Sequence, residues 1–282
     1  MPLSQPATNF YHGNLSASQN TTNIGYGENV LINTIFGAFS NVAFGVNSGM
    51  NITTGNANTL FGDGAGVSLT TGTNNVAIGT AALANPVNSN DNIAIGVNAM
   101  NTVTSAASAN VAIGQQALFM CRGFGNIAVG SFNSNALTTG GGNIVIGQAS
   151  GGALTVQNFN ILIGHQNALS LTGSGNIILG TGGGGTMNNA SNNIFIGNNS
   201  VPLTNVDTNA IIIGSNGISK GTNTTVIGNL NTTQTFLFGA LNIQSFTTAL
   251  APASVDGRMY YDTTLAKLRI GVGAVYQTIT SV

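Results

Sequence analysis

Short apolar segments recur along most of the chain in one pattern: an asparagine, an apolar residue, a variable residue, a second apolar residue and a glycine. Clear copies occupy residues 75–79, 92–96, 110–114, 143–147 and 160–164. Alternation over so few residues is typical of a short β-strand, and no helical period of 3.6 residues accompanies it. The pattern therefore predicts one such strand in each copy.

The closing glycine of each copy recurs at an almost constant spacing. From Gly45 to Gly214, successive closing glycines are 16 to 18 residues apart, and degenerate copies extend the series to Gly37 upstream and to Gly228 and Gly239 downstream. A fixed period of this kind identifies a repeat architecture. Helical repeats need units of about 30 residues or more, so a period of about 17 residues favours one coil of a β-solenoid.

A weaker apolar segment follows each closing glycine, as at 81–83, 98–100 and 116–118. We expect it to form a second extended segment, separated from the first by turns rich in Gly, Asn, Ser and Thr that suit positive φ angles. Stacked coils hydrogen-bond through parallel strands about 4.8 Å apart, so twelve to thirteen coils would form a rod about 60 Å long. The end coils need caps, because each coil buries its apolar side only against its neighbours.

Side-chain alternation places the residues of each strand on two faces. We expect the two large apolar residues of each strand to fill the interior of the coil: Val76, Ile78, Ile93, Ile95, Ile144, Ile146, Ile161 and Ile163. The middle residue then lies outside, where a continuous apolar stripe would exceed what a soluble monomer normally exposes. We predict that this stripe is a subunit interface, formed by Ala77, Ala94, Ala112, Ala128, Val145, Leu162, Ile178, Phe195 and Ile212.

A threefold arrangement about the rod axis buries one face of each chain, which favours a homotrimer; another oligomer and a monomer with an unusual surface stay open. The stripe is small up to Ala128 and bulky from Val145 onward. We therefore expect the chains to pack tightly around the axis in the first half of the rod and to separate or rotate in the second half.

An asparagine begins the strand in most copies. Stacked in register, the asparagine amides would form a hydrogen-bonded ladder that satisfies backbone groups of the turns. The residues concerned are Asn75, Asn92, Asn110, Asn126, Asn143, Asn160, Asn176 and Asn193. This pattern indicates a structural role for these asparagines and not a ligand site.

The segment 72–83, in which Asn-Asn-Val-Ala-Ile-Gly is followed by Ala-Leu, resembles the repeats of bacteriophage and giant-virus tail-fibre and surface-fibre proteins. It is also similar to the repeats of trimeric autotransporter adhesin heads, whose period is somewhat shorter. The resemblance covers about residues 30–240. It implies a left-handed, β-roll-like solenoid that is trimeric and does fibrous or adhesive work, and it implies no ligand.

The autotransporter pattern also includes a signal peptide, a coiled-coil stalk and a membrane anchor. Residues 1–6 lack a basic region followed by an apolar core, and no apolar run approaches the ~20 residues that span a bilayer. These departures favour the viral resemblance and an expectation of no membrane insertion.

The C-terminal segment differs in composition from the repeats. Residues 256–269 contain five of the 11 charged residues and resemble a short β-hairpin module near the C-termini of phage tail and viral fibre proteins. We expect strands at 258–261 and 267–270, joined by a turn at 262–264. The predicted organisation is an N-terminal attachment or joining segment (1–29), a β-solenoid (30–240) and a C-terminal β-hairpin cap (241–282), which we expect to set the trimer register.

The composition excludes several classes of partner. Charged residues make up 4% of the chain and the net charge is −1, whereas about a quarter of a typical globular protein is charged. The hydrophobic content of 42% argues against disorder, and the absence of a basic stripe argues against nucleic-acid binding. The single cysteine, Cys121, is expected to be buried or unreactive.

No grouping of residues indicates catalysis or a cofactor. The six acidic residues are scattered over different coils, and His12 and His165 are too few for a metal site unless three copies bring His165 together on an axis. Calcium-binding rolls need a repeated Asp that is absent here, and the glycine run 182–185 precedes no lysine. We expect no enzyme activity, no cofactor and no metal.

These observations favour a structural fibre protein that forms a rigid trimeric rod on a virion, as a tail or surface fibre, or that assembles into an extracellular filament. Its predicted partner is the chain itself, possibly also joined head to tail. The alternative is a host-binding adhesin that recognises surface glycans or proteins through solenoid loops, with residues 119–124 as the best candidate. Ice binding is disfavoured, because the threonines do not recur as a regular Thr-x-Thr array.

Overall fold

The computed structural model describes residues 22–35, 37–85, 87–102, 107–236, 243, 245–247, 258–272 and 275–279. Two compact units are present, Met1–Thr232 and Thr233–Val282. No helix occurs within the described ranges. The predicted all-β class, the solenoid and its period of about 17 residues are confirmed.

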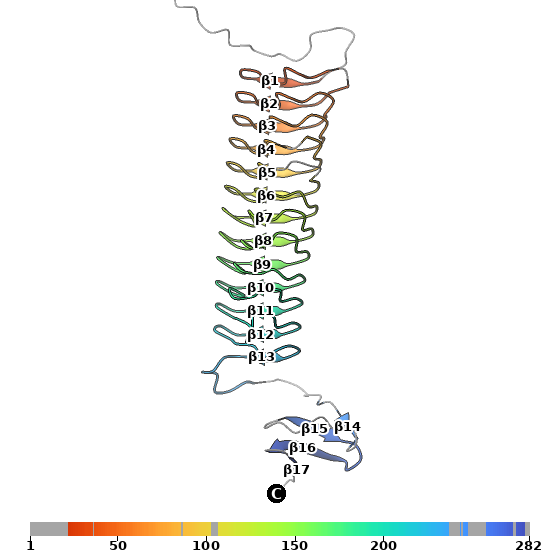
Figure 1. Cartoon of the computed structure of the whole chain (residues 1–282), viewed down its shortest axis with the longest axis vertical. Coiled ribbons are helices and arrows are strands. Elements are labelled where there is room, and N and C mark those ends of the chain that lie inside the picture. The colour runs from red at the N-terminus through yellow and green to blue at the C-terminus, as the bar shows by residue number, and fades with distance from the viewer. Residues whose placement is uncertain are drawn as a thin grey trace, which may run out of the picture. The chain divides into compact units, whose positions relative to one another are not determined.

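The first unit is a stack of coils, each contributing one strand to a thirteen-stranded parallel sheet whose order follows the sequence (Figure 1). Neighbouring strands are in register, so that Ala77 pairs with Ala94 and Ala94 with Ala112. The strands are β1 (Ile24–Tyr26), β2 (Val42–Phe44), β3 (Thr59–Phe61), β4 (Val76–Ile78), β5 (Ile93–Ile95), β6 (Val111–Ile113), β7 (Ile127–Val129), β8 (Ile144–Ile146), β9 (Ile161–Ile163), β10 (Ile177–Leu179), β11 (Ile194–Ile196), β12 (Ile211–Ile213) and β13 (Thr225–Ile227).

The solenoid begins earlier than the sequence pattern suggested. Strand β1 precedes residue 30 and is followed by Gly27, whereas Gly37 closes no strand. The first copy escaped notice because its middle residue is Gly25, not an apolar residue. At the other end, β13 is followed by Gly228, and Gly239 lies outside the described residues.

The second segment of each coil is a turn, so the prediction of two extended segments is wrong. Ala81 and Leu83 have φ angles of 53° and 48°, in the left-handed region. The chain reverses directly after the closing glycine, and the turn directs Ala82 and Leu83 into the interior, where both are fully buried. The short apolar segment therefore reflects burial inside a turn.

The closing glycines stack directly on one another. Gly79 has a φ angle of 130°, and a Cβ atom added there would lie 2.7 Å from the carbonyl carbon and oxygen of Gly96 in the next coil. Both the backbone conformation and the close approach of the coils exclude a side chain. This contact explains why the glycine recurs at every turn.

The two faces of the strand are opposite to those predicted. The residues expected in the interior, Val76, Ile78, Ile93, Ile95, Ile144, Ile146, Ile161 and Ile163, are half-buried or exposed, and Ile78 and Ile163 are each 40% exposed. The residues expected at a subunit interface are at most 1% exposed and fill the coils: Ala77, Ala94, Ala112, Ala128, Val145, Leu162, Ile178, Phe195 and Ile212.

The asparagine that begins the strand explains this reversal. Its amide must find partners inside the coil, and side chains alternate along a strand, so the residue two positions later also points inward. The middle residue of each strand therefore belongs to the core. Its two large neighbours point outward.

In several coils, side-chain size is exchanged between two positions, the middle strand residue and the fourth residue after the closing glycine. A Cβ atom on Gly66 would lie 2.9 Å from Cδ2 of Leu60, and one on Gly184 would lie 2.5 Å from Cδ1 of Ile178, so the two positions face each other. A large middle residue faces a small one in Leu60/Gly66, Val145/Gly151, Leu162/Ala168 and Ile178/Gly184, and a small one faces a large one in Ala77/Leu83, Ala94/Met100 and Ala112/Leu118.

The expected change in spacing between chains loses its basis, because the stripe on which it rested lies inside the coils. The exchange does not extend to every coil, since Ala128 and Ser134 are both small. Where it occurs, dense packing of the interior constrains the sum of the two volumes.

The asparagines form an uninterrupted ladder through the interior. Each side-chain Nδ2 donates to the Oδ1 of the asparagine one coil earlier, at 2.9 to 3.2 Å. It also donates, at 2.8 to 3.1 Å, to the backbone carbonyl three residues before the next asparagine. The eight predicted members are joined by Asn23, Asn41 and Asn58, and the ladder ends at Ala210, whose N–H donates to Asn193 Oδ1 at 2.8 Å.

The second unit is a four-stranded sheet in the order β14 (Ser245–Phe246), β15 (Met259–Asp262), β16 (Lys267–Val272) and β17 (Val275–Thr278). Strands β15 and β16 form the predicted hairpin, within a residue or two of its predicted bounds. A third antiparallel strand, β17, was not predicted. The compact unit begins at Thr233, earlier than the predicted boundary at 241.

The ladder predicts a large effect of removing one interior amide. Asn143→Ala leaves the backbone N–H of Asn160 and the carbonyl oxygen of Gln157 without their partners, and it removes one of the two acceptors of the Asn160 Nδ2. Each orphaned buried group costs about 1–3 kcal/mol, so we expect a loss of about 3 kcal/mol or more in the free energy of unfolding, measured by urea denaturation. The exposed Asn85→Ala should change it by less than about 0.5 kcal/mol. Equal losses would contradict the ladder's role.

The volume exchange predicts coupling within one coil. Leu118→Ala should lower the free energy of unfolding by about 2–5 kcal/mol, and Ala112→Leu by about 1–3 kcal/mol. The double variant should lose at least about 1 kcal/mol less than the sum, because the new leucine fills the space that the old one leaves. Leu118→Ala combined with Ala77→Leu, two coils away, should be additive. Additivity of the first pair in urea denaturation would refute the exchange.

Candidate functional surface on the solenoid sheet

The outer face of the sheet carries two uninterrupted rows of side chains, one from the first and one from the third residue of each strand. We call these residues the outer sheet face. The first row is Ile24, Val42, Thr59, Val76, Ile93, Val111, Ile127, Ile144, Ile161, Ile177, Ile194, Ile211 and Thr225; the third-position row is Tyr26, Phe44, Phe61, Ile78, Ile95, Ile113, Val129, Ile146, Ile163, Leu179, Ile196, Ile213 and Ile227.

This face is large and apolar. All its residues are half-buried or exposed, and none is charged. Thirteen strands about 4.8 Å apart and about 10 Å long give a projected area of roughly 600 Å², before the relief of the side chains is counted. That area already matches the largest apolar patch of a typical monomer, about 300–600 Å².

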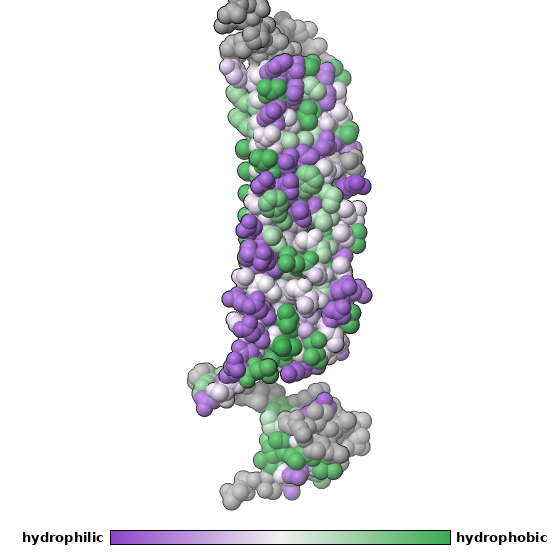
Figure 2. Space-filling view, turned by 60° about the vertical axis from the view of Figure 1, so that its left-hand side comes forward, coloured by the Kyte–Doolittle hydropathy of each residue, from purple (hydrophilic) through white to green (hydrophobic). Residues whose placement is uncertain are grey.

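A polar rim borders the face on the side of the closing glycines. The residue after each closing glycine is mostly polar, as in Asp63, Thr80, Gln148 and His165, all of which are exposed or half-buried. Figure 2 shows one side of the solenoid, where hydrophilic residues are interspersed with apolar ones. An apolar strip with a polar border has the anatomy of a protein–protein interface.

The N-terminal end of the outer sheet face is aromatic. The rings of Tyr26 and Phe44 are stacked with centroids 6.3 Å apart, and those of Phe44 and Phe61 with centroids 4.9 Å apart and an interplanar angle of 8°. Tyr26 is 52% exposed and Phe61 38% exposed. From β4 onward the same row contains only aliphatic residues.

The loop proposed from the sequence as an adhesive patch is exposed in part. Arg122 and Phe124 point outward on either side of the buried Gly123, and Phe124 is 68% exposed. Two coils later, Phe159 is 69% exposed although its φ angle of 58° is unusual for a bulky residue. The rings of Phe124 and Phe159 lie over the adjacent glycines of the intervening coil, Gly141 and Gly142.

The groups capable of chemistry are dispersed. Cys121 is buried, as expected, and burial raises the pKa of its thiol to about 11, which makes it unreactive at neutral pH. His165 is exposed on the polar rim, and His12 lies outside the described residues. Within the described residues, no three His, Cys, Asp or Glu side chains are close enough together to hold a metal ion.

One buried carboxylate, that of Asp207, links the last coils through hydrogen bonds. Asp207 is 3% exposed and accepts hydrogen bonds from the backbone N–H groups of Leu203 and Thr204, at 3.0 and 3.2 Å, and from the hydroxyls of Thr204 and Ser219. Burial alone would raise the pKa of Asp207, but the hydrogen bonds from Ser219 and Thr204 outweigh it and lower the pKa. Sequence reasoning missed this site, because the acceptor role of Asp207 depends on a residue one coil away.

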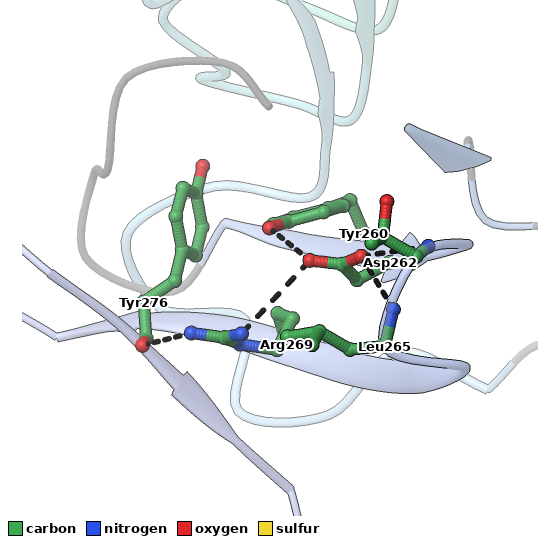
Figure 3. A network of polar contacts seen from close by, with 6 residues as sticks. Tyr260, Asp262, Leu265, Arg269 and Tyr276 are labelled. Carbon is green, nitrogen blue, oxygen red and sulfur yellow. Dashed lines mark hydrogen bonds and ion pairs between the residues drawn. The ribbon is translucent and has the colours of Figure 1, made fainter. Parts of the chain in front are cut away.

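The second unit is organised by Asp262 (Figure 3). Its fully buried carboxylate accepts the backbone N–H groups of Thr264 and Leu265, both at 3.0 Å, and the Tyr260 hydroxyl at 3.2 Å. Arg269 Nη1 lies 3.9 Å from the carboxylate. Burial and then the bond to Asp262 raise the pKa of Tyr260. These contacts fix the hairpin turn and resemble a folding core, not a reactive centre.

Comparison with known proteins adds no relative to this picture. No protein-family model matches the chain, no curated protein is significantly similar to it, and no solved structure matches it significantly. Among the described residues, there is no helix with the length and apolar character needed to cross a membrane.

The hydrogen-bonded Asp207 carboxylate predicts that the fold becomes less stable as the pH falls. A carboxyl with a lowered pKa in the folded state stabilises the fold above the unfolded-state value of about 3.8, and this stabilisation is lost as the pH falls through the folded-state value. Between about pH 6 and about pH 2, the urea midpoint of the protein should therefore fall, and it should fall less in Asp207→Asn. The exposed Asp63→Asn should follow the unmodified protein. A wild-type slope in Asp207→Asn would contradict the assignment.

Proposed function

We propose that the chain is a structural fibre protein, a rigid rod that associates with copies of itself and is displayed on a virion or assembled into an extracellular filament. The observation that carries this proposal is the outer sheet face, an apolar strip along the whole solenoid. Its area lies at the upper end of what isolated soluble proteins expose, which favours a partner that covers it.

The interior of the solenoid suits a mechanical role. The amide ladder and the glycine stack connect every coil to the next through fixed hydrogen bonds and backbone contacts. Only four acidic residues and two cations lie between residues 22 and 232, so few titratable groups can respond to pH or salt. We therefore expect the solenoid to be stiff along its length.

A second copy is the partner that fits the strip best. The rows repeat once per coil, and a chain with the same coil spacing can place side chains against them along their full length. The strip is only about 10 Å wide, since each strand has three residues, so three copies can meet at one axis with their rows in a common core. We therefore still propose a homotrimer, but with the large outward residues of each strand at the interface in place of the middle residues.

The virion or extracellular setting rests on the resemblance of the repeat and of the 256–269 segment to viral fibre sequences. Chains displayed outside a cell benefit from a fold with few charges and few exposed reactive groups. Cys121 is buried, in keeping with that setting.

A specific observation favours the alternative of a host-binding adhesin. Phe124 and Phe159 are strongly exposed, and Phe159 keeps a backbone conformation that disfavours a bulky side chain. Both rings lie over glycines of the intervening coil and stay largely exposed, and strained exposed residues are candidates for ligand contact. Arg122 adds a charge beside Phe124 on a surface with almost none, which suits an acidic glycan or protein group.

Light scattering of the purified protein tests the proposal. We expect a particle of three chain masses, and we expect Ile146→Asp/Ile163→Asp to dissociate it to monomers with an unchanged circular dichroism spectrum, because carboxylates cannot be buried against apolar rows. The control Val156→Asp alters an exposed valine outside the face and should leave the trimer intact. A monomeric wild-type protein would refute the proposed self-association.

A further inference from the structure

A periodic face does not define a unique register. Along β4 to β12, every outward residue is Ile, Val or Leu. Sliding one copy along another by one coil, about 4.8 Å, would exchange one aliphatic contact for an equivalent one. Registers are weakly specified where neighbouring positions are interchangeable, so an assembly of this chain needs an element that breaks the repetition.

The aromatic end supplies such an element. Tyr26, Phe44 and Phe61 occupy three successive positions of a row that is otherwise aliphatic. Their rings are stacked on one another along the rod, and Tyr26 and Phe61 are 52% and 38% exposed. Because the stack is confined to one end of the solenoid, it distinguishes parallel from antiparallel copies as well as one register from another.

The stack also differs from its surroundings in shape. Aromatic rings bury about 150–250 Å² each, and ring pairs gain about 0.5–1.5 kcal/mol beyond that burial. A one-coil shift would place one ring level opposite Ile78 and leave another without an aromatic partner. An antiparallel arrangement would oppose the rings to Ile196, Ile213 and Ile227. Only parallel copies in register bring all three ring levels together.

Building on the self-association proposed above, we infer that the stack of Tyr26, Phe44 and Phe61 sets the register and polarity of the assembly. Its occupant is the same stack of a second copy of this chain, aligned parallel and at the same level. The aliphatic rows supply the affinity, and the aromatic end selects one alignment among many of similar energy.

Disulfide trapping measures the register directly. One preparation carries Ile146→Cys and is labelled with ¹⁵N; another carries Ile163→Cys, one coil away, and is unlabelled. The two are unfolded, mixed, refolded together and oxidised, and the intact masses of the cross-linked dimers are recorded. Native Cys121 is buried and should not react. In-register copies give heavy–heavy and light–light dimers, whereas a one-coil shift gives heavy–light dimers.

We expect only heavy–heavy and light–light dimers from chains with the aromatic stack. Tyr26→Ile/Phe44→Ile/Phe61→Ile, introduced into both preparations, should retain the oligomer mass but add heavy–light dimers at a comparable yield. The control Phe39→Ile removes an exposed aromatic residue that lies outside the face and should give no heavy–light dimer. Phe44→Leu/Phe61→Leu provides a milder variant with the same expectation should the triple variant not fold.

The outcomes separate the two proposals. Heavy–light dimers from the unmodified face, in a protein that still forms oligomers, would overturn the inference and leave self-association standing. Strict register after removal of the rings would also overturn it and would point to the C-terminal unit. A protein that scatters light as a monomer would refute the self-association on which the inference rests.

Discussion

Every coil of this protein must lie in register on the next, about 4.8 Å away, and the rest of the structure depends on that stacking. Inside the solenoid, the asparagine amides form hydrogen bonds from each coil to the next. At the end of each strand, the closing glycines allow the coils to lie this close: a Cβ atom on Gly130 would lie 2.4 Å from the carbonyl oxygen of Gly147. Both elements act through the neighbouring coil. The repeated residues therefore stabilise contacts between neighbouring coils of the chain more than they stabilise a single coil.

From this stacking follows the division of side chains between inside and outside. The inward asparagine turns the middle residue of the strand into the core and turns its two large neighbours outward. The core then closes by matching the volumes of facing residues, as in Ala112 with Leu118 or Leu162 with Ala168. The outward residues are half-buried or exposed, and they form the apolar strip from which the proposed function is derived.

Much of the fold could be predicted from the sequence, because a fixed period reports the architecture without knowledge of any single contact. The period, the all-β class and the asparagine positions were accessible in this way, whereas the hairpin was expected from the resemblance of residues 256–269 to a fibre-protein module. The sidedness of the strand was not, since alternation separates two faces but does not say which one is interior. A polar residue with an obligatory hydrogen bond, Asn75 for example, held that information. The turn 81–83 was misjudged because apolar residues in left-handed turns carry the same signature as a short strand.

The central claim is that the outer sheet face is covered by other copies of the chain. An electron cryomicroscopy reconstruction of the assembled protein tests it most directly, through the exposure of Ile78 and Ile163, each 40% exposed in the single chain. The account predicts that both side chains are buried between neighbouring copies around a common axis. Assembled particles in which these isoleucines still face water would contradict it.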